Sequence, residues 1–175
     1  MSFLKKIKNS MGIGTIKFTL VVPTAIEGGR GQLEGDIILT AKSEQSVKDV
    51  EVWFKRIHRW DQRESVYNSS TQRYNDEWVS KSQSVELGHC IDSTAFDLKA
   101  EETKTIHFSL AFAPINPQYA NGGGPMGDGF WASLGNSFLS GPNIRNERIE
   151  YEVSGDVDLE DVAFDKGSSQ RVTIV

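Results

Sequence analysis

Apolar and polar residues alternate along several short stretches of the chain with a period of two, which is typical of half-buried β-strands. Glycine-rich or proline-containing segments separate these stretches, as at 27–31 and at 113–117. We therefore predict an all-β fold with seven or more strands and no helix of ordinary length after residue 14. The predicted strands cover 15–22, 33–39, 50–60, 84–91, 106–112, 149–157 and 172–174.

Each alternating stretch has one apolar side, and such sides need a facing sheet to exclude water. We therefore predict a two-sheet antiparallel, immunoglobulin-like β-sandwich. Arg56, His58 and Trp60 continue on the apolar side of their strand, which predicts that this strand runs beyond the core. The predicted core residues are Ile16, Phe18, Leu20, Leu33, Ile37, Leu39, Val50, Val52, Phe54, Ile106, Phe108, Leu110, Tyr151 and Val153.

Two segments interrupt the strand pattern. Residues 61–83 are polar and carry three aromatic side chains, which predicts a long exposed hairpin. Residues 118–146 are rich in glycine, and a loop of this length in a compact domain is usually functional or disordered. Its large apolar residues are costly to leave in water, so we expect them to bind a partner or to close one end of the sandwich. They are Phe130, Trp131, Leu134, Phe138 and Leu139.

The first fourteen residues have a different period. Phe3, Leu4 and Ile7 fall on one helical face beside Lys5, Lys6 and Lys8, which predicts a short amphipathic segment over 1–14. Such a segment can lie on an anionic membrane surface, so these six residues are candidate membrane contacts. The apolar run of a secretory signal is missing, so we expect a cytoplasmic location, with a membrane-peripheral one as the alternative.

Several of these stretches resemble a known family. The opening residues 1–6, with Gly12, Gly14 and Lys17, are similar to the start of bacterial sporulation-control proteins of the arrestin-like group. The stretches 33–39, 50–54, 105–114 and 149–153, with the closing residues 172–175, resemble strands of the arrestin N-domain. The resemblance implies one arrestin N-domain-like sandwich over 15–175, with inserts at about 61–83 and 118–146. It also implies an intracellular adaptor or regulator without enzymatic activity.

The length and composition of the chain exclude several classes of protein and several kinds of site. The 175 residues are enough for one domain with a sizeable core. A net charge of −5 argues against a general nucleic-acid binder, and the single cysteine excludes an internal disulfide or a cysteine-rich zinc site. The glycine-rich segment lacks the lysine of a phosphate-binding loop.

The sequence shows no catalytic constellation. Cys90 follows His89, and neighbours in a strand point to opposite faces, so we expect no catalytic pair there. The three histidines, at 58, 89 and 107, lie on different predicted strands without ligand spacing. We expect the carboxylates of Asp156, Asp158, Glu160 and Asp161 to form a solvated strand edge and turn, because the calcium-binding loop pattern is missing. We therefore predict no enzymatic activity, no metal and no cofactor.

Two surface features are candidate binding sites. Lys55, Arg56, Arg59 and Arg63 form a basic patch in the sequence that could grip phosphate on a lipid head group or a phosphopeptide, or pair with the acidic half of the chain. The hairpin aromatics Tyr67, Tyr74 and Trp78 could stack on sugars or cap the hairpin by cross-strand pairing.

The leading hypothesis is therefore a non-enzymatic adaptor that binds an unidentified protein, in sporulation- or stress-type control, either as a monomer or as a homo-oligomer. The alternatives are a peripheral membrane module and a sugar- or ligand-binding β-sandwich.

Overall fold

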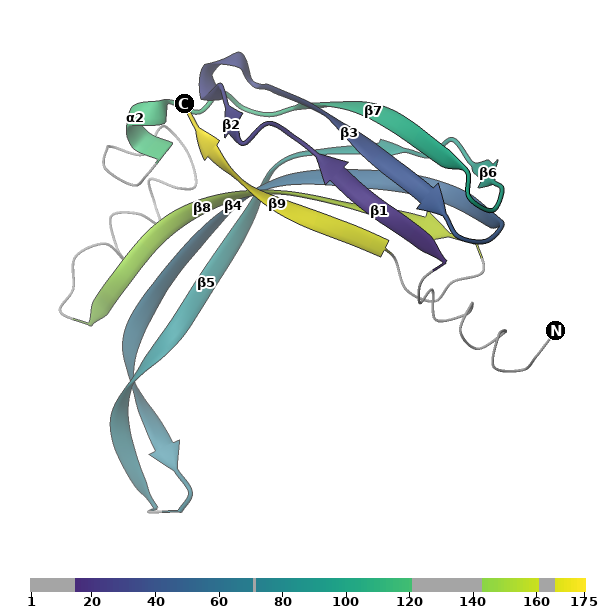
Figure 1. Cartoon of the computed structure of the whole chain (residues 1–175). Helices are drawn as coiled ribbons and strands as arrows, with labels where there is room; N and C mark the ends of the chain where they lie inside the picture. Colours follow the sequence, from purple (N-terminus) through teal and green to yellow (C-terminus); the bar gives the residue numbers. More distant parts are fainter. Residues whose placement is uncertain (1–14, 71, 121–142, 161–165) are drawn as a thin grey trace.

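A computed structural model describes residues 15–70, 72–120, 143–160 and 166–175 (Figure 1). The described chain is nearly all-β, as the alternating pattern predicted. Its helical elements are the 3-10 turn η1 (Gly28–Arg30) and the short helix α2 (Pro117–Ala120). Its strands are β1 (Ile16–Val21), β2 (Ala25–Ile26), β3 (Gln32–Ala41), β4 (Gln45–Asn68), β5 (Arg73–Asp92), β6 (Phe96–Leu98), β7 (Thr103–Ala111), β8 (Ile144–Leu159) and β9 (Lys166–Ile174).

The strands form two sheets. One sheet has the order β1-β3-β7 and is antiparallel throughout. The other has the order β2-β9-β8-β4-β5, with β6 also paired to β4, and only its β2–β9 pair is parallel. In this larger sheet β4 is an interior strand, because it pairs with β5 along one edge and with β8 along the other.

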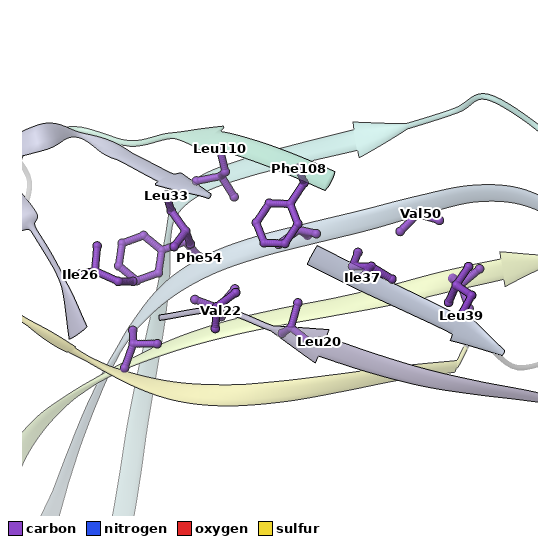
Figure 2. Packing of buried hydrophobic residues seen from close by; sticks show 14 of the residues in the cluster. Leu20, Val22, Ile26, Leu33, Ile37, Leu39, Val50, Phe54, Phe108 and Leu110 are labelled. Atoms are coloured by element: carbon purple, nitrogen blue, oxygen red, sulfur yellow. The ribbon is translucent and has the colours of Figure 1, made fainter. Parts of the chain in front are cut away.

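The core lies between the two sheets and draws side chains from both (Figure 2). Of the fourteen predicted core residues, twelve are buried. The other two, Phe18 on β1 and Ile106 on β7, are half-buried and pack against the core. Both lie on the outer strands of the three-stranded sheet, which also carry buried residues such as Leu20 and Leu110.

The predicted hairpin is present, but it is not an insert separate from the strands. β4 runs unbroken to Asn68 and returns as β5 from Arg73, so residues 61–83 continue the same two strands. The segment predicted as a glycine-rich loop, 118–146, also has different ends. α2 extends to Ala120 and β8 begins at Ile144, while residues 121–142 lie outside the described residues.

Beyond the core, β4 and β5 continue as a projecting arm, and β8 accompanies them as far as the pair Gln62–Ile144 (Figure 1). We define the arm as residues 57–68 of β4, 73–85 of β5 and 144–150 of β8. At the base of the arm, Ile149 of β8 still packs against the core, and Ile57 of β4 is buried on the other face of the sheet. β4 continues from there to Asn68, which confirms that the third predicted strand runs beyond the core.

Candidate binding surface

The two faces of the arm follow from strand alternation. Val50, Val52 and Phe54 of β4 point into the core, so the even-numbered residues that follow lie on the same, inner face. The odd-numbered residues, from Lys55 to Tyr67, lie on the outer face, turned away from the core. Cross-strand partners share a face, so the register assigns the side chains of β5 and β8 as well.

A half-buried carboxylate organises the outer face where the arm leaves the body. Glu150 of β8 accepts a hydrogen bond from Arg59 Nε at 3.0 Å and another from Arg148 Nε at 2.9 Å. Arg171 Nη2 of β9 lies 3.3 Å from the same carboxylate. Arg59 and Arg148 are direct cross-strand partners, and like charges in that position repel. Glu150 offsets this repulsion and holds three arginines together.

The ionisation of Glu150 follows from these contacts. Partial burial raises the pKa of its carboxyl, but the hydrogen bonds from Arg59 and Arg148 and the charge of Arg171 outweigh it. The pKa therefore lies below its ordinary value of 4.5. Because the folded state binds this proton less readily than the unfolded chain does, the stabilisation is present above about pH 4.5 and is lost at lower pH.

We predict that Glu150→Gln reduces this acid sensitivity. The variant loses the carboxylate that the three arginines share, so at pH 7 its free energy of unfolding is lower than that of the wild type. Below pH 4.5 the difference shrinks, because the wild-type carboxyl becomes protonated as well. Urea unfolding at pH 7 and pH 3 measures both effects. A constant difference between the two proteins at both pH values would contradict the ion cluster.

A second cluster lies further along the outer face. Asp61 of β4 accepts hydrogen bonds from Ser80 Oγ at 2.7 Å and from Asn146 Nδ2 at 2.8 Å. These bonds, with the charge of Arg145, hold the pKa of Asp61 below its ordinary value. The Arg145 guanidinium also lies 4.1 Å from the centre of the Trp78 ring, in a cation–π contact.

The tip of the arm carries two exposed tyrosines. Tyr67 and Tyr74 are cross-strand partners, and their ring centres are 5.3 Å apart. Arg63 and Asp76, 3.3 Å apart, lie next to them on the same face. The tyrosines pair as the hairpin-capping interpretation predicted, and Trp78 is engaged by Arg145 rather than stacked on either tyrosine.

The basic patch predicted from sequence is divided in the structure. Lys55, Arg59 and Arg63 lie on the outer face, whereas Arg56 lies on the inner face opposite Tyr151. Arg56 is separated from the other three residues because neighbouring residues of a strand point to opposite sides. Arg59 and Arg63 are paired with Glu150 and Asp76, so partners from the acidic half of the chain are present.

Polar contacts also join β4 to β8 on the inner face of the arm. His58 Nε2 lies 2.6 Å from Glu147, and the rings of His58 and Trp60 are 4.7 Å apart. Closer to the core, the Tyr151 hydroxyl donates to the carbonyl of Ala120 at 3.1 Å, which fixes α2 to β8. Burial raises the pKa of Tyr151, against the opposing charge of Arg56.

The arginines at 145, 148 and 171 were missed by the sequence analysis. The signal available was the run of charges from Arg145 to Glu150, which the prediction divided between a loop and a strand. Nothing in the sequence joins this run to Arg59, because their contact depends on the β4–β8 register across about ninety residues.

His89 and Cys90 lie on opposite faces of β5, as predicted. The His89 ring stacks on Trp53 on the outer face, with centres 5.2 Å apart. The Cys90 side chain packs against the core, and its burial raises the pKa of the thiol.

The other candidate ligands are dispersed. His107 lies 3.0 Å from Asp36, and Asp158 pairs with Lys48 at 3.4 Å. Within the described part of the chain, no three histidine, cysteine or acidic side chains come together as a metal site. Asp161, the last carboxylate of the predicted acidic cluster, lies outside the described residues.

Two sets of predicted contact residues also lie outside the described residues. They are the apolar set from Phe130 to Leu139 and the N-terminal set from Phe3 to Lys8. Of the helices that the structure describes, none has both the length and the apolar character needed to span a bilayer.

Comparison with known proteins gives similarity to solved structures only. Searches found no matching family model and no matching curated protein. Among solved structures, the chain is similar to Spo0M, a sporulation control protein from Bacillus subtilis, with a TM-score of 0.48 and 13% sequence identity. The match covers 93% of this chain and 50% of that protein, so the chain spans about half of its length.

Proposed function

We propose that this protein is a non-enzymatic, arrestin-like adaptor or regulator that acts by binding another protein through the outer face of the arm. The chain folds as an arrestin N-domain-like sandwich in this proposal, and its role lies in sporulation- or stress-type control within the cytoplasm. The strand patterns of the arrestin N-domain and the opening residues similar to sporulation-control proteins support these assignments.

One observation supports the proposed binding role most strongly: arginine and aromatic side chains are concentrated along the outer face of the arm. Arginine, tryptophan and tyrosine are the residue types enriched in interface hot spots. Four arginines of the arm, with Arg171 of β9 beside them, contact three carboxylates on this face, whereas the whole chain has a net charge of −5. The four arginines outnumber the three carboxylates by one, and this small local surplus of positive charge favours an acidic partner surface. The arginines are Arg59, Arg63, Arg145, Arg148 and Arg171.

Charge reversal on the arm tests this proposal. Arg148 and Arg171 have side-chain exposures of 60% and 69%, so they are available to a partner, while Arg59 remains to pair with Glu150. We expect the double variant Arg148→Glu/Arg171→Glu to lose bound proteins from an extract of the source cells by about tenfold or more, since each arginine hot spot contributes over 1 kcal/mol. Quantitative mass spectrometry of the proteins retained on the immobilised chain measures this loss.

The matched control is Lys17→Glu/Lys99→Glu, which makes the same change of charge at exposed sites outside the arm. We expect it to retain the same proteins as the wild type. Equal retention by the arm variant would contradict the proposal. If the arm variant retained the same proteins but no longer co-sedimented with anionic phosphatidylglycerol vesicles, this result would support the peripheral membrane alternative.

A further inference from the structure

The free edge of β5 is the second notable feature of the arm. β5 is the last strand of its sheet, and within the described ranges no strand pairs with its outer edge. An open strand edge presents unpaired N–H and C=O groups and is a template for another strand. Proteins usually protect such edges with proline, bulges or several charges. The segment Val79–Val85 contains no proline and a single charge, that of Lys81.

The sequence of this segment reads almost the same in both directions. It is Val-Ser-Lys-Ser-Gln-Ser-Val, centred on Ser82. An antiparallel pair of identical strands around a two-fold axis places residues related by that symmetry opposite each other. With the axis at Ser82, valine lies opposite valine and serine opposite serine, while Lys81 lies opposite Gln83 of the other copy.

We propose that a second copy of this chain binds at the free edge of β5, so that the two arms form one continuous antiparallel sheet. This pairing puts no like charges directly opposite each other over the seven residues. The two Lys81 side chains become diagonal neighbours, and each is already 2.8 Å from Glu64 of its own chain.

The burial pattern of the segment agrees with this arrangement. Val79, Lys81, Gln83 and Val85 are half-buried on the inner face, and the three serines are exposed on the outer face. Pairing across the two-fold axis would cover the valines, because cross-strand partners share a face. It would leave the serines and the outer face of each arm open. The dimer is therefore compatible with partner binding at the arginines.

A cysteine at the symmetry axis tests the register directly. In a Cys90→Ala background, Ser82→Cys places two thiols opposite each other with Cα atoms about 4.5–5.5 Å apart, which suits a disulfide. We expect mild oxidation to convert most of this variant to a covalent dimer. Ser84→Cys is the matched control, because its two copies lie about 13 Å apart along the strands. Equal cross-linking of both variants would overturn the proposal.

Charge complementation tests the same contact without oxidation. We expect the wild type to sediment as a dimer and the Ser82→Asp and Ser82→Lys variants each to sediment as monomers, because like charges then meet at the axis. An equimolar mixture of the two variants should restore the dimer. A monomeric wild type, or a Ser82→Asp variant that remains dimeric, would overturn the proposal. Arg148→Glu/Arg171→Glu should remain dimeric, which separates this test from that of partner binding.

Discussion

Replacing Phe54 by alanine is expected to lower the free energy of unfolding by about 3–5 kcal/mol, the usual cost of removing a buried phenylalanine side chain. Phe54 is fully buried on β4, an interior strand of the larger sheet. Its ring centre lies 5.0 Å from that of Phe112 and 6.0 Å from that of Tyr151, so truncation leaves a cavity beside these two rings.

Urea unfolding at pH 7 measures the effect of Phe54→Ala. Ile91→Ala is the control, because Ile91 on β5 is 50% exposed and its truncation creates no cavity. We expect the control to lose less than about 1 kcal/mol. Similar losses in the two variants would show that the sheets do not meet at Phe54.

The second large effect is expected at Gly28, where the turn η1 meets the C-terminal strand. A Cβ atom at this position would lie against the carbonyl oxygen of Ile115 and 2.7 Å from Cγ2 of Ile174. The backbone cannot easily move away, because Gly28 donates to the Val175 carbonyl at 3.1 Å and accepts from the Ile115 N–H at 3.0 Å. We expect Gly28→Ala to cost about 1–3 kcal/mol, in the range of overpacked sites.

The neighbouring glycine gives the control for this substitution. A Cβ atom at Gly29 would meet nothing within 4 Å, and Gly29 lies in the same 3-10 turn. We expect Gly29→Ala to change the free energy of unfolding by less than about 1 kcal/mol, in either direction. Urea midpoints of the two variants therefore separate close packing from a general cost of replacing glycine. Equal midpoints would contradict the close approach at Gly28.

The core residues could be predicted from the sequence, because side chains alternate between the two faces of a strand whichever strands pair with it. Val50, Val52 and Phe54 face one way whatever strand lies beside them. Alternation does not determine how deeply each residue is buried. Phe18 and Ile106 alternate in the same way as Leu20 and Leu110 on the same strands, yet Phe18 and Ile106 are only half-buried.

The clusters of the arm could not be predicted, because they depend on strand register. Asp61 meets Ser80 through the β4–β5 pairing and Asn146 through the β4–β8 pairing. An irregularity of the β4–β8 pairing between Arg59 and Asp61 adds one residue to β8 and shifts every later contact. In the sequence these residues are up to 85 positions apart, and no local pattern joins them.

The arm extends beyond the main core, so other contacts must hold its strands in register. The ion cluster at Glu150 and the hydrogen bonds of Asp61 join β8 to β4 at successive positions along the outer face. A sheet fixed in this way displays its side chains in a constant arrangement. This pre-organisation reduces the entropy that a bound partner would have to overcome.

The central claim is that the outer face of the arm binds a protein partner, and photo-cross-linking in living source cells tests it most directly. A benzoyl-phenylalanine at Tyr74, which is 71% exposed on the outer face, should form a covalent adduct with a partner protein. The same probe at Val21, 45% exposed on β1, should not. No adduct at Tyr74, or the same adducts at both positions, would contradict the account.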